Sequence, residues 1–169
     1  MNKLYAPWRA DYTVEVDGKD HKTPKNTCVF CQNFSESWDE HHFILRRFEH
    51  VTVMLNLYPY NAGHLLILPL DHKADLNTLS RDARIELMEV TNHSIEIVKK
   101  TLHCHGVNVG LNLGKAAGAG IPSHLHMHVL PRFNGDTNFL PTLAQTKVVS
   151  FDLRALFEKL KPEFNIITL

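Results

Sequence analysis

The chain has 169 residues, a length that predicts one domain with a single sizeable core. Lys and Arg together number 18, as do Asp and Glu, so the net charge is zero with histidine neutral, and binding to nucleic acid or to an anionic membrane through bulk charge is not expected. The sequence has no apolar run long enough for a membrane span, no apolar core of a secretory signal and no disulfide framework in its three cysteines, so a reduced, cytoplasmic protein is the default interpretation.

The first part of the chain predicts an ordered arm followed by two strands. Residues 1–40 are polar and irregular and contain the pair Cys28 and Cys31, so we interpret them as an N-terminal arm and not as a separate domain. The short runs 42–48 and 51–57 are rich in β-forming residues, and the two polar residues between them predict a tight reversal.

The middle of the chain predicts a buried strand and the main helix. Pro, Asn and Gly mark residues 58–63 as a loop, and the mostly apolar run 64–69 predicts a strand that Pro69 ends. Residues 81–103 predict a long helix with Ser80 as its N-cap. The helix face expected to meet the core consists of Ile85, Met88, Ile95, Val98 and Leu102.

The last third of the chain predicts two more strands and a short helix. Apolar and polar residues alternate over 107–113, small residues form a loop over 114–120, and residues 124–130 form a second strand, ended by the proline that follows. A C-terminal extension over 141–169 contains a short predicted helix at 152–161. Because strands outnumber helices, we expect the α+β class, an antiparallel sheet with a long helix packed on it, in one domain that spans the whole chain.

Three histidines alternate with apolar residues in the strand expected at 124–130. Successive side chains of a strand point to opposite faces, so His124, His126 and His128 share one face. Such a row could bind a metal ion, or one imidazole could attack an electrophile; the alternative is three solvent-facing polar residues. The glycine-rich loop just before the row lets backbone N–H groups approach an anion, which favours phosphate next to imidazole.

The pattern at residues 124–130, His-φ-His-φ-His-φ-φ with φ apolar, resembles the signature of the histidine triad (HIT) superfamily of nucleotide hydrolases and transferases. Residues 56–69 resemble the earlier block of that superfamily, Asn-x-x-Pro…Gly-His-x-Leu-x-x-Pro. Residues 110–120, 131–139 and 5–9 are most similar to the bacterial diadenosine tetraphosphate (Ap4A) phosphorylase-like branch, with the fragile-histidine-triad hydrolases next. The resemblance implies a HIT-like fold and a dinucleoside polyphosphate, such as Ap4A, as the substrate.

The resemblance also implies roles for individual residues. His126 would be the nucleophile that attacks the α-phosphorus and forms a covalent nucleotidyl-histidine, and His128 would hydrogen-bond the phosphoryl oxygens. The other implied positions are His124 and His64 as further catalytic residues, Asn56 on the ribose, Asn112, Gly118, Ala119 and Gly120 on phosphate, and Phe133 stacked on a base. Some phosphorylases of this branch carry Gly-Ser where this chain has Ala119-Gly120, so hydrolysis stays open beside phosphorolysis.

Cys28 and Cys31 have the spacing of half a zinc site, since two thiolates three residues apart can bind one ion. Taken alone, the pair is also compatible with redox chemistry or with two small buried residues. Some HIT proteins bind zinc through such a pair together with two histidines, which here correspond to His72 and His124. The resemblance thus implies a closed Cys₂His₂ site with a structural Zn²⁺.

Other functions are compatible with the same residues. A nucleoside phosphoramidase would cleave P–N bonds with the same strand, and a non-catalytic nucleotide sensor would only bind. A nucleic-acid end-processing enzyme would need a basic extension, against which the zero net charge argues. The expected partners are a nucleotide substrate and, by resemblance, a second copy in a homodimer, with no nucleic acid and no membrane.

Overall fold

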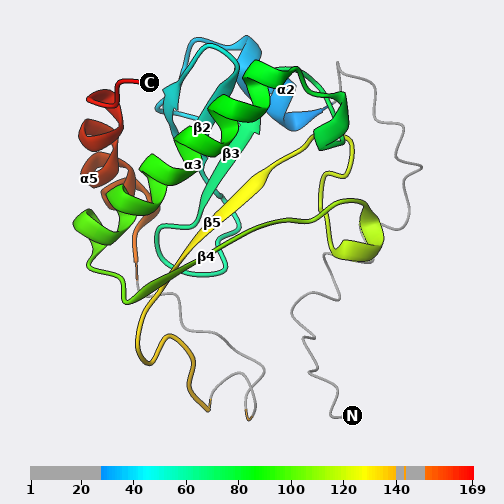
Figure 1. Cartoon of the computed structure of the whole chain (residues 1–169). Coiled ribbons are helices and arrows are strands. Elements are labelled where there is room, and N and C mark those ends of the chain that lie inside the picture. Colours follow the sequence, from blue (N-terminus) through cyan, green and yellow to red (C-terminus); the bar gives the residue numbers. More distant parts are fainter. Residues whose placement is uncertain (1–27, 140–142, 144–150) are drawn as a thin grey trace.

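Five antiparallel strands form one sheet within the residues that the structure, a computed structural model, describes: 28–139, 143 and 151–169 (Figure 1). In spatial order they are β1 (Ile44–Arg47), β2 (Val51–Leu55), β3 (Leu65–Pro69), β5 (Met127–Arg132) and β4 (Gly106–Leu111). The sheet confirms the predicted α+β class. Most of the predicted N-terminal arm and the start of the C-terminal extension lie outside the described residues.

Helices cover both faces of the sheet. The long helix α3 (Arg81–Leu102) and the C-terminal helix α5 (Leu153–Asn165) pack on one face and enclose the main core. The short helix α2 (Val29–Ser35) belongs to a second, smaller apolar cluster on the opposite face. Two 3₁₀ turns, η3 (Leu76–Thr78) and η4 (Lys115–Ala117), lie in the connections. The sequence analysis did not predict α2.

The alternation of side chains in β3 connects the two apolar clusters. Leu65 and Ile67 lie in the main core, whereas Leu66 and Leu68 lie in the cluster under α2. All five residues of β3 are buried, as the mostly apolar run predicts. The sheet therefore has no broad solvent-facing side along β3, and a polar group on the α2 face has to be satisfied within the protein.

The buried face of α3 differs in part from the predicted one: Val98 is buried and Ile95 and Leu102 pack against the core as expected, but two residues do not. Ile85 and Met88 are 45% and 55% exposed, while the buried face consists of Ala83, Leu87, Val90, Thr91, Ser94, Ile97 and Val98. The hydroxyls of Thr91 and Ser94 donate to helix carbonyls four residues earlier, at 2.6 and 2.7 Å. Because both hydroxyls are satisfied inside the helix, they can face the core without a partner from the sheet. The apolar pattern alone did not reveal this.

Strand β5 also differs from the prediction, because it begins at Met127 and continues through Pro131 to Arg132. The backbone N–H of His105 donates to the carbonyl of Arg132, so the backbone of Arg132 points toward β4 and that of Pro131 points to the opposite side. Pairing with β3 has already ended at Val129, so the missing N–H of Pro131 breaks no strand pairing. Helix α5 likewise runs four residues beyond its predicted end.

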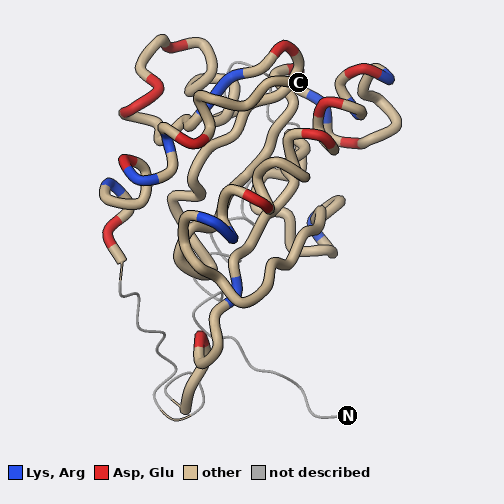
Figure 2. The backbone as a smooth tube through the Cα atoms, turned by 60° about the vertical axis from the view of Figure 1, so that its left-hand side comes forward, with Lys and Arg blue, Asp and Glu red and all other residues tan. Residues whose placement is uncertain are grey.

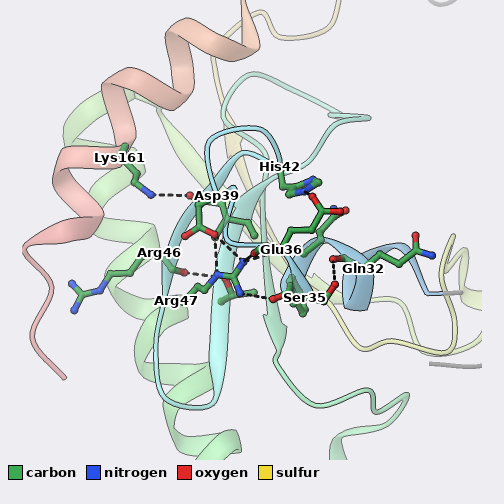
Figure 3. Close-up of polar contacts among 12 residues, drawn as sticks. Gln32, Ser35, Glu36, Asp39, His42, Arg46, Arg47 and Lys161 are labelled. Carbon is green, nitrogen blue, oxygen red and sulfur yellow. Dashed lines mark hydrogen bonds and ion pairs between the residues drawn. The ribbon is translucent and has the colours of Figure 1, made fainter. Parts of the chain in front are cut away.

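Two neighbouring arginines of β1 hold the C-terminal ends of two helices, and Figure 3 shows the contacts of one of them, Arg47. The guanidinium of Arg47 donates to the Asp39 carboxylate at 2.9 Å and to the carbonyls of Phe34 and Glu36 at 2.6 and 2.8 Å, at the end of α2. Arg46 donates to carbonyls at the end of α5, among them that of Phe164 at 2.8 Å. A helix end that meets a cation in this way is fixed against the sheet.

Charged residues of both signs are interleaved along the described chain (Figure 2), which fits the zero net charge. In the part of the chain that the structure describes, no helix combines the length and the apolar character that a membrane span requires.

Candidate active site and metal centre

The three histidines lie at the start of β5, on the sheet face that α2 covers. His124 and His126 precede the strand, and only His128 lies in it. The rings of His126 and His128 are 5.1 Å apart, whereas the ring of His124 lies 5.3 Å from that of His72. The predicted row therefore divides into two sites, because His126 and His128 form one pair and His124 joins another group of ligands.

His126 is held as a neutral imidazole with a defined tautomer. Its Nδ1 lies 2.8 Å from the backbone oxygen of His124, and because a carbonyl only accepts, Nδ1 carries the hydrogen. Burial lowers the pKa of His126, with the same hydrogen bond acting in the opposite direction. Nε2 therefore keeps its lone pair, as a nucleophile requires.

A chain of hydrogen bonds sets the tautomer of His128. The backbone N–H of Tyr60 donates to Nδ1 of His64 at 3.1 Å, and the side-chain amide of Asn56 lies 3.3 Å from the same atom. Nε2 of His64 therefore carries the hydrogen and donates to Nδ1 of His128 at 2.9 Å. His128 is left with its hydrogen on Nε2, so it is a hydrogen-bond donor beside the lone pair of His126.

Two aromatic residues that the sequence analysis missed pack against these rings. The ring of Tyr60 lies nearly parallel to that of His128, with centroids 5.9 Å apart. Phe30 of α2 lies 5.6 Å from His126 and is 7% exposed. Tyr60 lies inside the block at 56–69, and Phe30 lies between the two cysteines. These positions next to motif residues could have indicated that both aromatic residues belong to the site.

The glycine-rich loop lies beside Asn112, since a Cβ placed on Gly118 would be 3.9 Å from the Asn112 amide nitrogen. Gly118 has φ +89°, a conformation that favours glycine. The N–H groups of Gly118 and Ala119 donate to carbonyls within the loop, whereas that of Gly120 makes no hydrogen bond within the described residues. The prediction that Gly118, Ala119 and Gly120 bind phosphate stays a prediction.

Among the described residues, no ring contact joins Phe133 to the pair formed by His126 and His128. Its ring meets that of His105, with centroids 6.5 Å apart. The prediction that it stacks on a base stays a prediction, and within the described residues Tyr60 is an aromatic residue that contacts His128.

Cys28, Cys31, His72 and His124 form the second group, and their candidate ligand atoms all lie within 4.8 Å of one another. Nε2 of His124 lies 2.9 Å from the carbonyl of Pro69 and so donates to it, which leaves the Nδ1 lone pair facing both sulfur atoms at 3.5 Å. Burial, above all, lowers the pKa of His124 to about 4. A neutral imidazole is the form that binds a metal.

This donor set fits a zinc ion. Tetrahedral zinc with ordinary Zn–N and Zn–S bonds separates its nitrogen and sulfur ligands by about 3.6 Å. The Cys31 sulfur lies 3.2 Å from Nδ1 of His72 and 3.5 Å from Nδ1 of His124. Two thiolates and two imidazoles complete the tetrahedron, so the ion would have no open position for a substrate and its role would be structural.

The family model of the HIT domain matches residues 39–135 of this chain. A Mycobacterium tuberculosis protein named AP-4-A phosphorylase is 38% identical over 157 residues, which cover 91% of this chain and 80% of the relative. An uncharacterised HIT-like protein of Saccharolobus solfataricus is 30% identical over 139 residues, with 79% of this chain and 98% of the relative covered.

Solved structures agree with the fold. A zinc-bound histidine triad family protein from Mycobacterium smegmatis has a TM-score of 0.68 at 26% identity and covers 84% of this chain and 96% of its own. The diadenosine triphosphate hydrolase of Plasmodium falciparum has a TM-score of 0.58 at 18% identity, covering 73% and 75% of the two chains, a similarity that concerns the fold alone.

Proposed function

The chain belongs to the HIT family, and on that premise we propose that it is a nucleotidyl-transferring enzyme that cleaves a dinucleoside polyphosphate of the Ap4A class at the α-phosphorus. The observation that carries the proposal is the tautomer of His126, whose Nδ1–H is fixed by the His124 carbonyl at 2.8 Å so that Nε2 is a nucleophile. The similarity to the mycobacterial AP-4-A phosphorylase supports the choice of substrate.

The first step would transfer the nucleotidyl group to His126. Its Nε2 forms a bond to the α-phosphorus while the bond from that phosphorus to the bridging oxygen breaks, and the nucleoside polyphosphate leaves with the bonding electrons. The Nε2–H of His128 donates to the oxygen on which negative charge develops. The charge on that oxygen is thereby stabilised without a change in the tautomer of His126.

The second step would release the nucleotide. An oxygen of water or of inorganic phosphate attacks the same phosphorus, the N–P bond breaks with its electrons returning to Nε2 of His126, and the proton of the attacking oxygen passes to the solvent. Water yields a nucleoside monophosphate and phosphate yields a nucleoside diphosphate. Ala119 and Gly120 offer no hydroxyl to an incoming phosphate, so the choice of acceptor is a question for product analysis.

Zinc held by Cys28, Cys31, His72 and His124 would supply a structural cross-link, because the closed donor set leaves no coordination position for a substrate. The residues of the site then act around that cross-link. His124 connects the two sites, because its ring faces the thiols and its backbone carbonyl fixes the nucleophile.

We also propose that two copies associate. The edge strand β4 leaves Val109 42% exposed, and α3 exposes Ile85 and Met88. Sedimentation at several concentrations tests this, and a single monomeric species at all of them would refute it.

The thiols at Cys28 and Cys31 fit a reduced, cytoplasmic location, which stays a prediction.

Product analysis of Ap4A turnover, with and without inorganic phosphate, tests the function. We expect ATP together with AMP in water, or with ADP when phosphate is the acceptor, and His126→Ala should lose turnover while its fold and nucleotide binding persist. After a brief reaction and denaturation, mass spectrometry should find one adenylyl group on the wild type and none on the variant. Full turnover by His126→Ala, or two ADP without phosphate, would refute attack by His126 on the α-phosphorus. Turnover of adenosine phosphoramidates with none of Ap4A would instead favour the phosphoramidase.

A further inference from the structure

A second polar cluster lies at the far end of β5, outside the catalytic residues and the metal ligands. The carboxylate of Asp136, 9% exposed, accepts from the guanidinium of Arg132 at 2.6 and 3.0 Å and from the backbone N–H of Phe133 at 3.2 Å. The same carboxylate accepts from the side-chain amide of Asn61 at 2.9 Å. Arg132 is itself fixed by Asn108 of β4 at 2.8 Å.

Asn61 belongs to the loop between β2 and β3, and its amide also donates to the carbonyl of Pro131 at 3.2 Å. This carbonyl is available because the backbone at Pro131 points away from β4, beyond the end of the pairing with β3. The backbone oxygen of Asn61 accepts from the N–H of His64 at 3.3 Å. The two ends of Asn61 thus join the loop to β5 on one side and to His64 on the other.

The residue before Asn61 in the loop is Tyr60, whose backbone N–H forces Nδ1 of His64 to accept. If His128 carried its hydrogen on Nδ1, Nε2 of His64 would have to accept that hydrogen bond. The hydrogen of His64 would then lie on Nδ1, where it would point at the N–H of Tyr60. Two donors facing one another in a site with little water are unfavourable, so the Tyr60 N–H, the nearer of the two donors to Nδ1 of His64 beside the Asn56 amide, disfavours this tautomer while the loop stays in place.

We propose that Asp136, acting through Asn61, is a positioning residue that holds the loop so that His128 presents its Nε2–H to the substrate. The inference rests on the proposed function for its catalytic consequence but not for its structural part. The contacts described for Asp136 are with Asn61, Arg132 and the Phe133 N–H and include no histidine. Its carboxylate acts by fixing the amide of Asn61, and the backbone N–H of the neighbouring residue then sets two tautomers in series.

Histidine tautomers and turnover are measured together to test this. In long-range ¹H–¹⁵N spectra of the full chain, recorded without substrate, His64 and His128 of the wild type should both show hydrogen on Nε2. Asp136→Ala and Asn61→Ala should mix the two tautomers of His128 and lower kcat by about tenfold to a hundredfold, with KM within about threefold, because the donor is misplaced and the binding groups remain. Asp136→Asn keeps an oxygen for Asn61 and should restore most of kcat.

Lys100→Ala is the matched control, because it removes an exposed ion pair with Glu163, at 2.8 Å, between α3 and α5. It should change neither the spectra nor kcat. Unchanged tautomers in Asp136→Ala, or equal losses in the Ala and Asn variants, would overturn the inference and leave a structural ion pair with Arg132. If one of the two alanine variants does not fold, the other decides the question, and failure of both to fold would also overturn it. A wild type inactive on Ap4A refutes the proposed function alone, since the spectra need no turnover.

Discussion

Replacing Phe30 by alanine should weaken both the fold and the proposed catalytic site. The ring centroid lies 5.5 Å from that of His124 and 5.6 Å from that of His126, and the residue is 7% exposed. A buried phenylalanine removes about 150–250 Å² from water, which at about 25 cal/mol/Å² corresponds to an upper bound of about 4–6 kcal/mol. Phe30 belongs to the smaller of the two apolar clusters, so we expect a loss of about 3–4 kcal/mol, toward the lower end of measured Phe→Ala costs.

Urea denaturation measures the loss of stability, and a melting temperature lower by roughly 10 °C should accompany it. The cavity beside His126 should also reduce kcat by about tenfold, because small displacements of a nucleophile are costly. Phe157→Ala is the control, since Phe157 is 3% exposed in the main core and should cost similar stability. At a temperature where both variants are folded, Phe157→Ala should keep its kcat.

The pair of variants separates a catalytic contribution from a general loss of stability. Equal losses of kcat in the two folded variants would show that Phe30 contributes only to packing. A stability change below about 1 kcal/mol in Phe30→Ala would refute the estimate from burial itself.

Three further predictions concern the buried face of α3, the metal ligands and the C-terminal end of α2. Leu87→Ala should cost about 2–5 kcal/mol in urea denaturation and Met88→Ala less than about 1 kcal/mol, because Leu87 is fully buried and Met88 is 55% exposed; the reverse order would restore the helix face predicted from sequence. Cys31→Ser should lose most of the zinc that elemental analysis finds in the purified wild type, since its sulfur faces both histidine ligands, and wild-type zinc content in the variant would contradict the site. Arg47→Ala should destabilise the chain by about 1–3 kcal/mol by leaving carbonyls at the end of α2 unpaired, and an unchanged denaturation midpoint would show that water replaces the guanidinium.

The local pattern of the sequence predicted the features that depend on one residue or on a few near neighbours, such as a helix cap or the end of a strand. The Ser80 side chain accepts from the N–H of Ala83 at 3.0 Å and begins α3 where the cap was expected. Pro69 ends β3 as expected, and the apolar run before it is fully buried. These features depend on a residue and its immediate neighbours, so a single sequence is sufficient to find them.

The resemblance brought together residues far apart in the chain, but it could not show how they are oriented. It grouped Cys28, Cys31, His72 and His124, and the structure places their ligand atoms within 4.8 Å. That His124 turns to the thiols while its backbone oxygen fixes His126 is visible only in the structure. The motifs of the family indicate which distant residues lie near one another, whereas the direction in which each ring points depends on partners that only the folded chain provides.

By itself, the sequence determined the α+β class, the long helix and the buried strand, because hydrophobic periodicity and caps are local properties, whereas the histidines and cysteines were grouped by the resemblance to the HIT superfamily. Tertiary structure alone decided which face of α3 is buried, where β5 begins, and which nitrogen of each histidine carries the hydrogen. The face of α3 depends on hydroxyls satisfied within the helix, and the tautomers depend on the carbonyl of His124 and the N–H of Tyr60. The hydrogen on His64 and His128 thus follows from partners that meet only once the chain has folded, whereas the face of α3 also depends on bonds formed within the helix.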